Sequence, residues 1–214
     1  MRVLGDRLAA YRARQARKVR AVYDSMIREL AARGFADHIL AVNEQFPNAV
    51  LPSAEGELVA LADLRARGPL VITFFRGEWC PYCRLTLDAL AAAQPAFEAA
   101  GAHLIAITPE TGGLALEARR KHHARFEILS DVDCGLGLAC GVVFRTPEVY
   151  RSLLLHFGTD LAKRHGNDAW FLPIPCTFVV DSAGVVRWRF ASLDFTMRAE
   201  PDDVIAALGA LGTT

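Results

Sequence analysis

Three things are scarce in this 214-residue chain: cysteine, net charge and long apolar runs. Five cysteines are too few for a disulfide scaffold in a chain of this size. No stretch approaches the roughly 18 apolar residues of a membrane span, and the N-terminus lacks the apolar core of a secretory signal peptide. The formal net charge is zero, so bulk charge favours no class of partner. We therefore expect a soluble cytoplasmic protein without membrane or nucleic-acid partners, in which a cysteine pair is more often catalytic than structural.

The sequence does contain enough apolar residues, 52%, to bury the core of one ordinary domain. Its charge is unevenly distributed, because residues 1–33 carry nine Lys or Arg residues against three Asp or Glu residues. Apolar side chains recur there at three- and four-residue spacing, which predicts one long helix over residues 3–33, and a second short helix is expected over residues 37–43. We interpret residues 1–45 as an N-terminal helical extension that packs on the domain or on a second subunit of a homodimer. Binding of its basic face to nucleic acid or to an acidic membrane is the less favoured alternative, because Arg-rich helix faces are common.

The chain is organised around residues 70–83, where an apolar, β-branched and aromatic run leads into a Cys-Pro-Tyr-Cys sequence. The run is typical of a strand buried on both faces, and it breaks at Gly77. Apolar residues then continue at helical spacing. Pro81 suits the first position of this helix, which puts Cys80 at the N-cap, where free N–H groups and the helix dipole stabilise a thiolate. Cys83 follows about one helical turn later, so the two thiols can close a disulfide, and the pattern predicts a thiol redox site.

A Cys-x-x-Cys pair can also be half of a zinc site or an inert structural pair. Redox chemistry is favoured here because a buried strand precedes the motif, Trp79 stands before the first cysteine, and no second Cys-x-x-Cys follows. Cys134 and Cys140 are six residues apart, a poor spacing for metal ligands, and Cys176 is alone. We expect no metal ion and no organic cofactor, and mainly structural roles for Cys134 and Cys140.

Strands and helices alternate through the rest of the chain. The patterns predict two short strands within residues 49–61, buried strands at 103–108, 126–129 and 141–144, and a hairpin of strands at 176–181 and 185–190. Helices are expected at 114–125, 131–139, 147–157 and 201–211, with an irregular insert before residue 175. Together these patterns predict an α/β fold in which residues 46–214 form a mixed sheet sandwiched by helices, with the cysteine pair at the carboxyl end of a central strand.

Residues 74–83, followed by an Ala/Leu-rich helix and by residues 104–110, resemble the thioredoxin fold. They resemble more closely the peroxiredoxin-like branch of the alkyl hydroperoxide reductase/thiol-specific antioxidant family. The resemblance covers about residues 46–212, and Ile174-Pro175 is similar to the cis-proline of thioredoxin-like proteins, whose loop faces the active-site cysteines. It implies a thioredoxin-like fold and the activity of a thiol-dependent, antioxidant peroxidase.

The motif departs from the peroxiredoxin pattern. Where that family carries Pro, Thr and the peroxidatic Cys, this chain has Arg76, Cys80 and Cys83. The distant Arg that helps the family to bind peroxide is expected near Pro175 and Cys176 and is absent there. The peroxiredoxin register assigns the nucleophile to Cys83, whereas the thioredoxin register assigns it to Cys80. We favour Cys80, because a thiol at the N-cap is solvent-accessible and meets free N–H groups, whereas one a turn inside is more shielded.

The leading hypothesis for function is reduction of hydrogen peroxide or organic hydroperoxides by the Cys80–Cys83 pair. Cys80 would form a sulfenic acid, Cys83 would resolve it as a disulfide, and an external thioredoxin- or glutaredoxin-like thiol would restore both. One alternative is a thiol–disulfide oxidoreductase with little peroxidase activity, which the missing Arg favours. The other is a non-catalytic protein, either a redox-regulated scaffold or a module that holds a metal at the thiols.

Four further residues are candidates for the substrate pocket. Arg76 ends the main strand beside the thiols, and it either stabilises the thiolate and binds peroxide or forms a salt bridge at the surface. Trp79 is expected to line the mouth of the site. The resemblance implies that Pro175 and Cys176 face the cysteine pair, where Cys176 is either an alternative resolving thiol or, as we prefer, a small buried residue.

Polar residues elsewhere carry weaker signals. His122 and His123 lie on a basic helix and are expected to be solvated. The insert before residue 175 contains four residues that could cover the site as a lid: His165, Asn167, Asp168 and Trp170.

Overall fold

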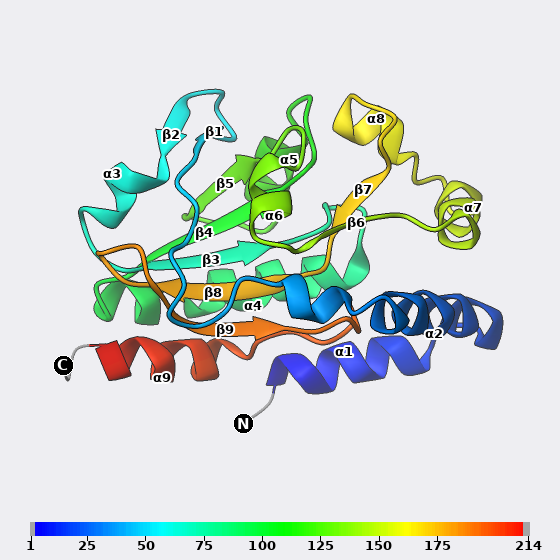
Figure 1. The fold of residues 1–214 in the computed structure, drawn as a ribbon, viewed down its shortest axis with the longest axis horizontal. Coiled ribbons are helices and arrows are strands. Elements are labelled where there is room, and N and C mark those ends of the chain that lie inside the picture. The colour runs from blue at the N-terminus through cyan, green and yellow to red at the C-terminus, as the bar shows by residue number, and fades with distance from the viewer. Residues whose placement is uncertain (1–2, 212–214) are drawn as a thin grey trace.

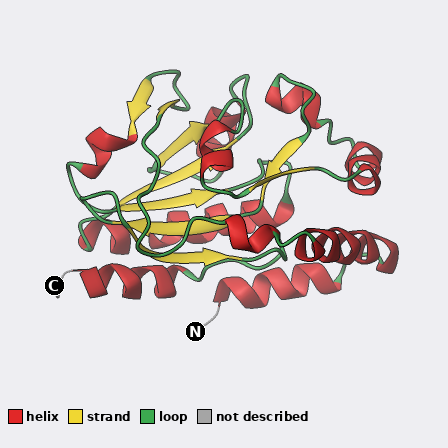
Figure 2. Ribbon diagram, in the orientation of Figure 1, coloured by secondary structure: helices red, strands yellow, loops and turns green. Residues whose placement is uncertain are grey.

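A five-stranded mixed sheet forms the centre of the computed structural model, which describes residues 3–211 (Figures 1 and 2). The strands lie in the order β5-β4-β3-β8-β9, with bounds β3 Leu70–Phe74, β4 His103–Thr108, β5 Glu127–Ser130, β8 Cys176–Val180 and β9 Val186–Ala191. β3 pairs in parallel with β4, and β4 with β5, whereas β8 runs antiparallel to both β3 and β9. The predicted mixed α/β sheet and its closing hairpin are therefore confirmed.

Helices pack around this sheet, and short strand pairs flank it. α4 (Pro81–Ala99) packs against β4, α1 and α9, and α9 also contacts β8 and β9. The remaining helices are α1 Val3–Ala13, α2 Arg17–Ala32, α3 Leu61–Arg65, α5 Leu114–Lys121, α6 Gly135–Ala139, α7 Glu148–His156, α8 Leu161–His165 and α9 Pro201–Leu211. The flanking strands are β1 Val50–Pro52 with β2 Leu58–Ala60, and β6 Val143–Arg145 with β7 Phe171–Pro173. Within the described part of the chain, no helix has the length and apolar character needed to span a bilayer.

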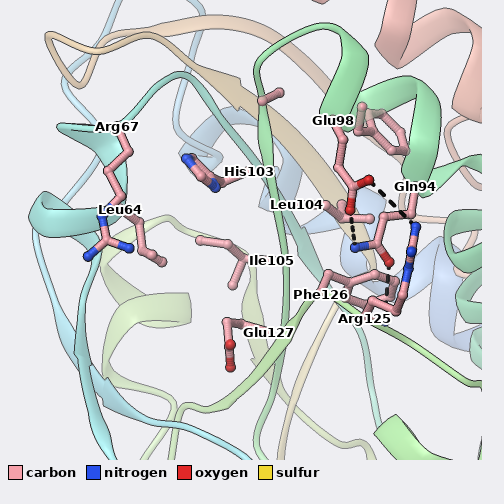
Figure 3. Close-up of a pocket in the computed structure, with 12 residues that line it drawn as sticks. Leu64, Arg67, Gln94, Glu98, His103, Leu104, Ile105, Arg125, Phe126 and Glu127 are labelled. Carbon is pink, nitrogen blue, oxygen red and sulfur yellow. Dashed lines mark hydrogen bonds and ion pairs between the residues drawn. The ribbon is translucent and has the colours of Figure 1, made fainter.

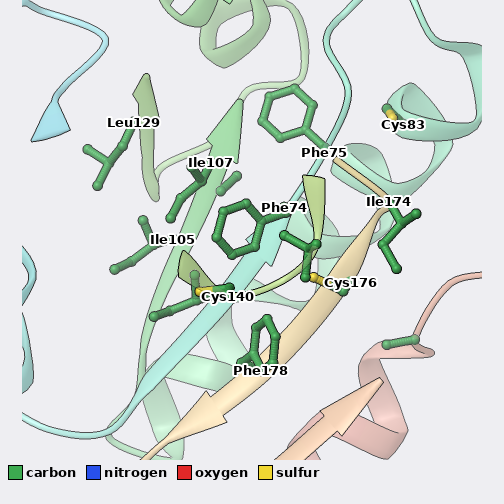
Figure 4. Close-up of a cluster of buried hydrophobic side chains, with 14 of the residues drawn as sticks. Phe74, Phe75, Cys83, Ile105, Ile107, Leu129, Cys140, Ile174, Cys176 and Phe178 are labelled. Carbon is green, nitrogen blue, oxygen red and sulfur yellow. The ribbon is translucent and has the colours of Figure 1, made fainter. Parts of the chain in front are cut away.

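The core around β3 explains why this strand is a rigid platform. All five residues of β3 are buried, as expected for a strand with neighbours on both sides and helices over it. Phe74 meets Phe178 edge to face, with ring centroids 6.3 Å apart, in a cluster that also contains Cys140 and Cys176 (Figure 4). Packing at this density leaves the end of β3 little freedom to move.

The N-terminal segment forms two helices where one was predicted. The chain turns after Ala13, with the amides of Arg14 and Gln15 donating to the carbonyls of Tyr11 and Arg12. The break lets α1 pack on α4 while α2 packs on α7, two surfaces that a single straight helix would not cover. Both helices lie at the end of the sheet where β3 ends (Figure 1). In this structure the segment packs on the rest of the chain, which is one of the two alternatives considered for it.

Three other expectations were wrong in detail. The helix predicted at residues 37–43 is a short 3-10 helix, η1, at Phe35–His38. The irregular insert before residue 175 contains α8 and strand β7, which pairs with β6. No cis peptide bond occurs within residues 3–211, so the bond between Ile174 and Pro175 is trans. The Ile174 amide donates to the Val142 carbonyl at 2.8 Å and continues the β6–β7 pairing, and the chain then enters β8 in an extended form.

Candidate thiol redox site

The cysteine pair lies on the loop and first helical turn that follow β3. Cys80 has extended backbone angles at the N-cap of α4, and Pro81 occupies the first helical position, as predicted. The loop depends on Gly77, whose φ of +134° favours glycine. A Cβ atom there would lie 2.6 Å from the Glu110 carboxyl carbon and from the Trp79 indole nitrogen. The loop thus requires at position 77 a backbone conformation that residues other than glycine rarely adopt.

Both sulfurs are enclosed. Cys80 and Cys83 are each 0% exposed, so the expectation that an N-cap thiol would be solvent-accessible is wrong. Tyr11 of α1 packs edge to face on Tyr82, which stands between the two cysteines in the sequence, with ring centroids 5.1 Å apart. Position at the N-cap determines which N–H groups a thiol meets, but it does not determine what packs over it.

Two arginines contact the two sulfurs. Nη2 of Arg76 donates to Cys80 Sγ at 3.1 Å, and Nη2 of Arg198 lies 3.6 Å from Cys83 Sγ. The backbone N–H of Arg76 also donates to Cys83 Sγ at 3.5 Å. Arg76 is only 2% exposed, which excludes the surface salt bridge considered as an alternative for it. Each sulfur therefore has its own guanidinium.

The Arg76 guanidinium is held by aromatic rings. Its Nη1 donates to the Tyr150 hydroxyl at 2.7 Å. Its central carbon lies 3.8 Å from the ring centroid of Phe195, 5.0 Å from that of Trp79 and 5.6 Å from that of Tyr150, distances typical of cation–π contacts. Burial opposes the charge of Arg76, but neighbouring Cys80 and Tyr150 raise its pKa, so the guanidinium stays charged.

The charges make the thiol pair asymmetric. Burial opposes ionisation of Cys80, but a hydrogen bond from the Cys83 thiol together with Arg76 and Arg198 holds the pKa of Cys80 well below its usual range. Burial and the neighbouring Cys80 sulfur raise the pKa of Cys83 well above its usual range. The site thus favours one thiolate, at Cys80, that accepts a hydrogen bond from one thiol, at Cys83.

A cavity of about 230 Å³ lies beside Cys80. Aromatic and apolar side chains dominate its lining: Tyr11, Gln15, Tyr23, Arg76, Trp79, Pro81, Tyr82, Tyr150, Leu153, Leu154, Phe157 and Thr159. Trp79, which we expected to line the mouth of the site, lines this cavity. The hydroxyl of Tyr82 is buried without a hydrogen-bond partner among the described residues, and this side chain lines the same space. Side chains of the N-terminal segment and of α7 thus complete a pocket beside Arg76 and the residues on either side of Cys80, and the buried Cys80 does not itself line it.

Another pocket, of about 270 Å³, lies elsewhere and contains no thiol (Figure 3). It is lined by residues of α3, α4 and the first halves of β4 and β5, including Gln94 and Glu98, and by Arg67 and Arg125 from the loops beside them. Its polar groups bond mainly to one another, since Arg125 donates its amide to Gln94 Oε1 at 3.1 Å and pairs with Glu98 at 3.5 Å. It is not connected with the chemistry of the cysteine pair.

Buried carboxylates hold the loop that carries the cysteines. The Glu78 amide donates to Glu110 at 2.8 Å, and Arg164 pairs with Glu110 at 2.6 Å. Burial disfavours the charge of Glu78, but His122 and Lys121 lower its pKa to about 2. His122 is buried between Glu78 and Asp88, so the expectation that it is solvated was wrong, whereas its neighbour at 123 is exposed.

The remaining predicted residues are buried. Pro175 is buried at the start of β8, and Cys176 lies in the apolar cluster beside Phe74, where burial raises its pKa (Figure 4). Burial, followed by nearby Asp131, raises the pKa of Cys134 and of Cys140 to about 12 each. These three thiols are therefore protonated at neutral pH.

The expected lid residues do not line the thiol pocket. His165 is buried, and burial lowers its pKa to about 4, while Asn167 bonds to the His165 carbonyl and Trp170 stacks with Arg151. α7 lines the pocket instead. In the part of the chain that the structure describes, no three His, Cys, Asp or Glu side chains gather in a way that could hold a metal ion.

Sequence reasoning missed Arg198, Tyr150 and Phe195. They come from α7 and from the irregular segment between β9 and α9, so no local motif links them to the cysteines. The sequence around Arg198 is mixed, with Asp194, Thr196 and Glu200 nearby, and it does not set this arginine apart.

Comparison with known proteins agrees with this geometry. The model of the AhpC/TSA family matches residues 42–189. No curated protein matches the chain. Among solved structures, peroxidoxin BcpB from Mycobacterium tuberculosis has a TM-score of 0.63 at 19% identity, with 80% of this chain and 98% of that one covered. A PrxQ mutant from Xylella fastidiosa has a TM-score of 0.62 at 15% identity, with 81% and 98% covered.

A third similar structure is the bacterioferritin comigratory protein of Xanthomonas campestris, described for its alkyl peroxide reduction activity. It has a TM-score of 0.59 at 21% identity, with 81% of this chain and 98% of that one covered. At these identities the structures show the shared thioredoxin-like fold, whereas the family model spans most of the chain. The chain belongs to the AhpC/TSA family, and it is a peroxiredoxin-like, thiol-based peroxidase.

Proposed function

We propose that this protein reduces hydrogen peroxide or organic hydroperoxides through a redox pair formed by Cys80 and Cys83. The observation that carries the proposal is the 3.1 Å contact between the Arg76 guanidinium and Cys80 Sγ, beside a pocket that Arg76 also lines. A thiolate is the reactive form of cysteine toward peroxides, and a buried guanidinium keeps it charged at neutral pH. The low pKa of Cys80 supports it as the nucleophile, and the raised pKa of Cys83 suits a resolving thiol.

The oxidative half of the cycle uses groups that line the pocket. The Cys80 thiolate attacks one peroxide oxygen, an S–O bond forms and the O–O bond breaks. The sulfur gives up two electrons, and the leaving oxygen takes a proton and departs as water or an alcohol. Arg76 and the Tyr150 hydroxyl lie beside the sulfur and can stabilise charge on that oxygen. The unpartnered Tyr82 hydroxyl is a further hydrogen-bonding group for a bound hydroperoxide.

Resolution and reduction follow from the position of Cys83. Its sulfur attacks the Cys80 sulfenic acid, an S–S bond forms, and the hydroxyl leaves as water with the Cys83 proton. A dithiol then returns two electrons by exchange. We propose a thioredoxin- or glutaredoxin-like reductant, a cytoplasmic location, a possible homodimer, and a division of the chain into residues 1–45 and 46–214.

A thiol–disulfide oxidoreductase with little peroxidase activity is the second candidate. The placement of Cys80 before Pro81 at a helix N-terminus favours it, together with the lack of an Arg at Pro175 and Cys176. The burial of both sulfurs counts against it, because a bulky disulfide would have to displace the side chains over them. A non-catalytic scaffold or metal-holding module is set aside, since the chain belongs to a family of peroxidases.

Peroxide consumption by the reduced protein tests the proposal. We expect turnover with hydrogen peroxide or cumene hydroperoxide in the presence of dithiothreitol, no turnover in Cys80→Ser, and a sulfenic acid trapped by mass spectrometry in Cys83→Ser. Cys176→Ser is the matched control and should keep wild-type rates. A sulfenic acid on Cys83 in Cys80→Ser would reverse the two roles. Failure to react with peroxide, with ready exchange against a model disulfide, would favour the second candidate.

A further inference from the structure

The segment between β9 and α9 brings an arginine against the second sulfur. Arg198 is 8% exposed, and its Nη2 lies 3.6 Å from Cys83 Sγ. Its Nη1 donates to the Phe195 carbonyl, and to the Met197 carbonyl at 2.8 Å. Its Nε is buried without a hydrogen-bond partner among the described residues. Carbonyl dipoles compensate a buried positive charge only in part, so a negative charge on the adjacent sulfur would be strongly favoured.

In the reduced protein this contact has little negative charge to stabilise. The Cys83 thiol keeps its proton and donates it toward Cys80, whose thiolate is already held by Arg76. The charge on Cys83 develops only when the S–S bond breaks during reduction. An arginine placed at this sulfur is therefore suited to the reductive half of the cycle and not to the peroxide step.

We propose that Arg198 is a catalytic residue of the reductive half-reaction, where it stabilises Cys83 as the leaving thiolate. The proposal rests on the proposed Cys80–Cys83 disulfide. A thiolate of the external dithiol attacks Cys80 Sγ, a new S–S bond forms, and the Cys80–Cys83 bond breaks with its electron pair on Cys83. The second thiol of the reductant then attacks the mixed disulfide and releases Cys80 as a thiolate, while Cys83 takes up a proton. The reductant loses two electrons and the pair gains them.

The two guanidinium groups thus act in different halves of the catalytic cycle. Trp79, Pro81 and Tyr82 line the pocket, and they flank Cys80 in the sequence. We therefore expect the reductant to attack Cys80 and not Cys83. Thiol–disulfide exchange is faster when the leaving thiol is the better anion, and Arg198 is the charged side chain that contacts the leaving sulfur. Arg76 serves the nucleophile and Arg198 serves the leaving group.

The experiment separates the two half-reactions. Wild type, Arg198→Met and Arg198→Lys are oxidised with diamide, so that the disulfide forms without peroxide, and its reduction by dithiothreitol is followed by alkylation and mass spectrometry. Oxidation of the reduced pair by hydrogen peroxide is measured in parallel. Arg189→Met is the matched control, because Arg189 also donates to two carbonyls, those of Ile39 and Leu40, at 2.5 and 2.7 Å.

We expect Arg198→Met to slow reduction by about tenfold or more, as for loss of one donor to a developing anion. Its oxidation by peroxide should change by less than about threefold, because Arg198 acts on Cys80 only as a more distant charge. The midpoint potential should change little, because Cys83 is protonated in the reduced protein and Arg198 stabilises its charge only while the S–S bond breaks. Arg198→Lys should recover part of the reduction rate, and Arg189→Met should match wild type.

Several results would overturn the role of Arg198. These are an unchanged reduction rate, an equal slowing of both half-reactions, or the same effect in Arg189→Met. If Arg198→Met does not fold, Arg198→Lys decides: a selective loss of reduction rate supports the proposal, and unchanged rates refute it. If the wild-type protein does not react with peroxide, but reduction of its diamide-formed disulfide still slows in Arg198→Met, the peroxidase proposal fails and the role of Arg198 stands.

Discussion

Replacing Arg76 with Met should remove the charge that holds the Cys80 thiolate while keeping much of the volume of the side chain. Nη2 of Arg76 donates to Cys80 Sγ at 3.1 Å in a site closed to bulk solvent. A hydrogen bond to a charged group contributes about 1.5–3 kcal/mol. The Coulomb energy of two unit charges at this distance, about 5 kcal/mol at an effective dielectric constant near 20, is an upper limit.

The loss of this interaction energy should lower the rate at which Cys80 reacts with peroxide. The pKa of Cys80 should rise in Arg76→Met, because the remaining contributions from burial oppose its ionisation. At about 1.4 kcal/mol per factor of ten, we expect the reaction of Cys80 with hydrogen peroxide at neutral pH to slow by roughly 10- to 150-fold. The protein should stay folded, since Cys80 can take up a proton when the guanidinium is lost, which leaves no uncompensated buried charge, and Met keeps apolar contact with the rings of Trp79 and Phe195.

The assay is rapid mixing of the reduced protein with peroxide, combined with titration of the thiolate by its ultraviolet absorbance. Arg84→Met is the control, because Arg84 bonds to the Glu78 carbonyl at 2.7 Å in the same loop but contacts no sulfur. Equal rates and equal titration curves for wild type and Arg76→Met would refute the reasoning. Loss of rate in Arg84→Met to the same extent would show that the loop, and not the guanidinium at the sulfur, sets the reactivity.

Three further predictions concern the supports of the site. Gly77→Ala should lower the free energy of unfolding by about 1–3 kcal/mol in urea denaturation, because its Cβ would lie 2.6 Å from the Glu110 carboxyl carbon at a positive φ. His122→Gln should remove a pH dependence from the free energy of unfolding. Contact with Glu78 raises the pKa of His122, although burial opposes it. The stabilisation from His122 is therefore complete below about pH 6.5 and is lost as the pH rises through the raised pKa. Thermal unfolding of wild type that does not weaken with rising pH would contradict this. Arg12→Met should weaken the attachment of α1 and speed alkylation of the thiols by a bulky maleimide, with no change in the stability of the reduced core. An unchanged alkylation rate would contradict the idea that α1 limits access to the thiols.

Local chemistry explains which parts of the site could be predicted from sequence. Gly77, Cys80 and Pro81 specify a turn, an N-cap and a first helical residue within five positions, so the place of the thiols follows from backbone propensities alone. The mixed sheet follows in the same way from buried, β-branched runs. The contacts of Arg198 with Cys83 and of Tyr150 with Arg76 join residues 115 and 74 positions apart, and no periodicity encodes such distances.

The burial of the thiols has a different origin and a functional consequence. The AhpC/TSA model begins at residue 42, whereas the wall of the pocket beside Arg76 and Trp79 includes Tyr11, Gln15 and Tyr23 from the segment before it. That segment is anchored by Arg12, which donates to Thr196 at 3.0 Å, and by the α1 amide of Gly5, which donates to Glu200 at 2.6 Å. The contact between Arg76 and Cys80 therefore lies within the part of the chain that matches the family, whereas Arg198 lies after it and part of the pocket wall lies before it. Selectivity among peroxides and reductants should follow substitutions in the N-terminal helices more than substitutions in the sheet.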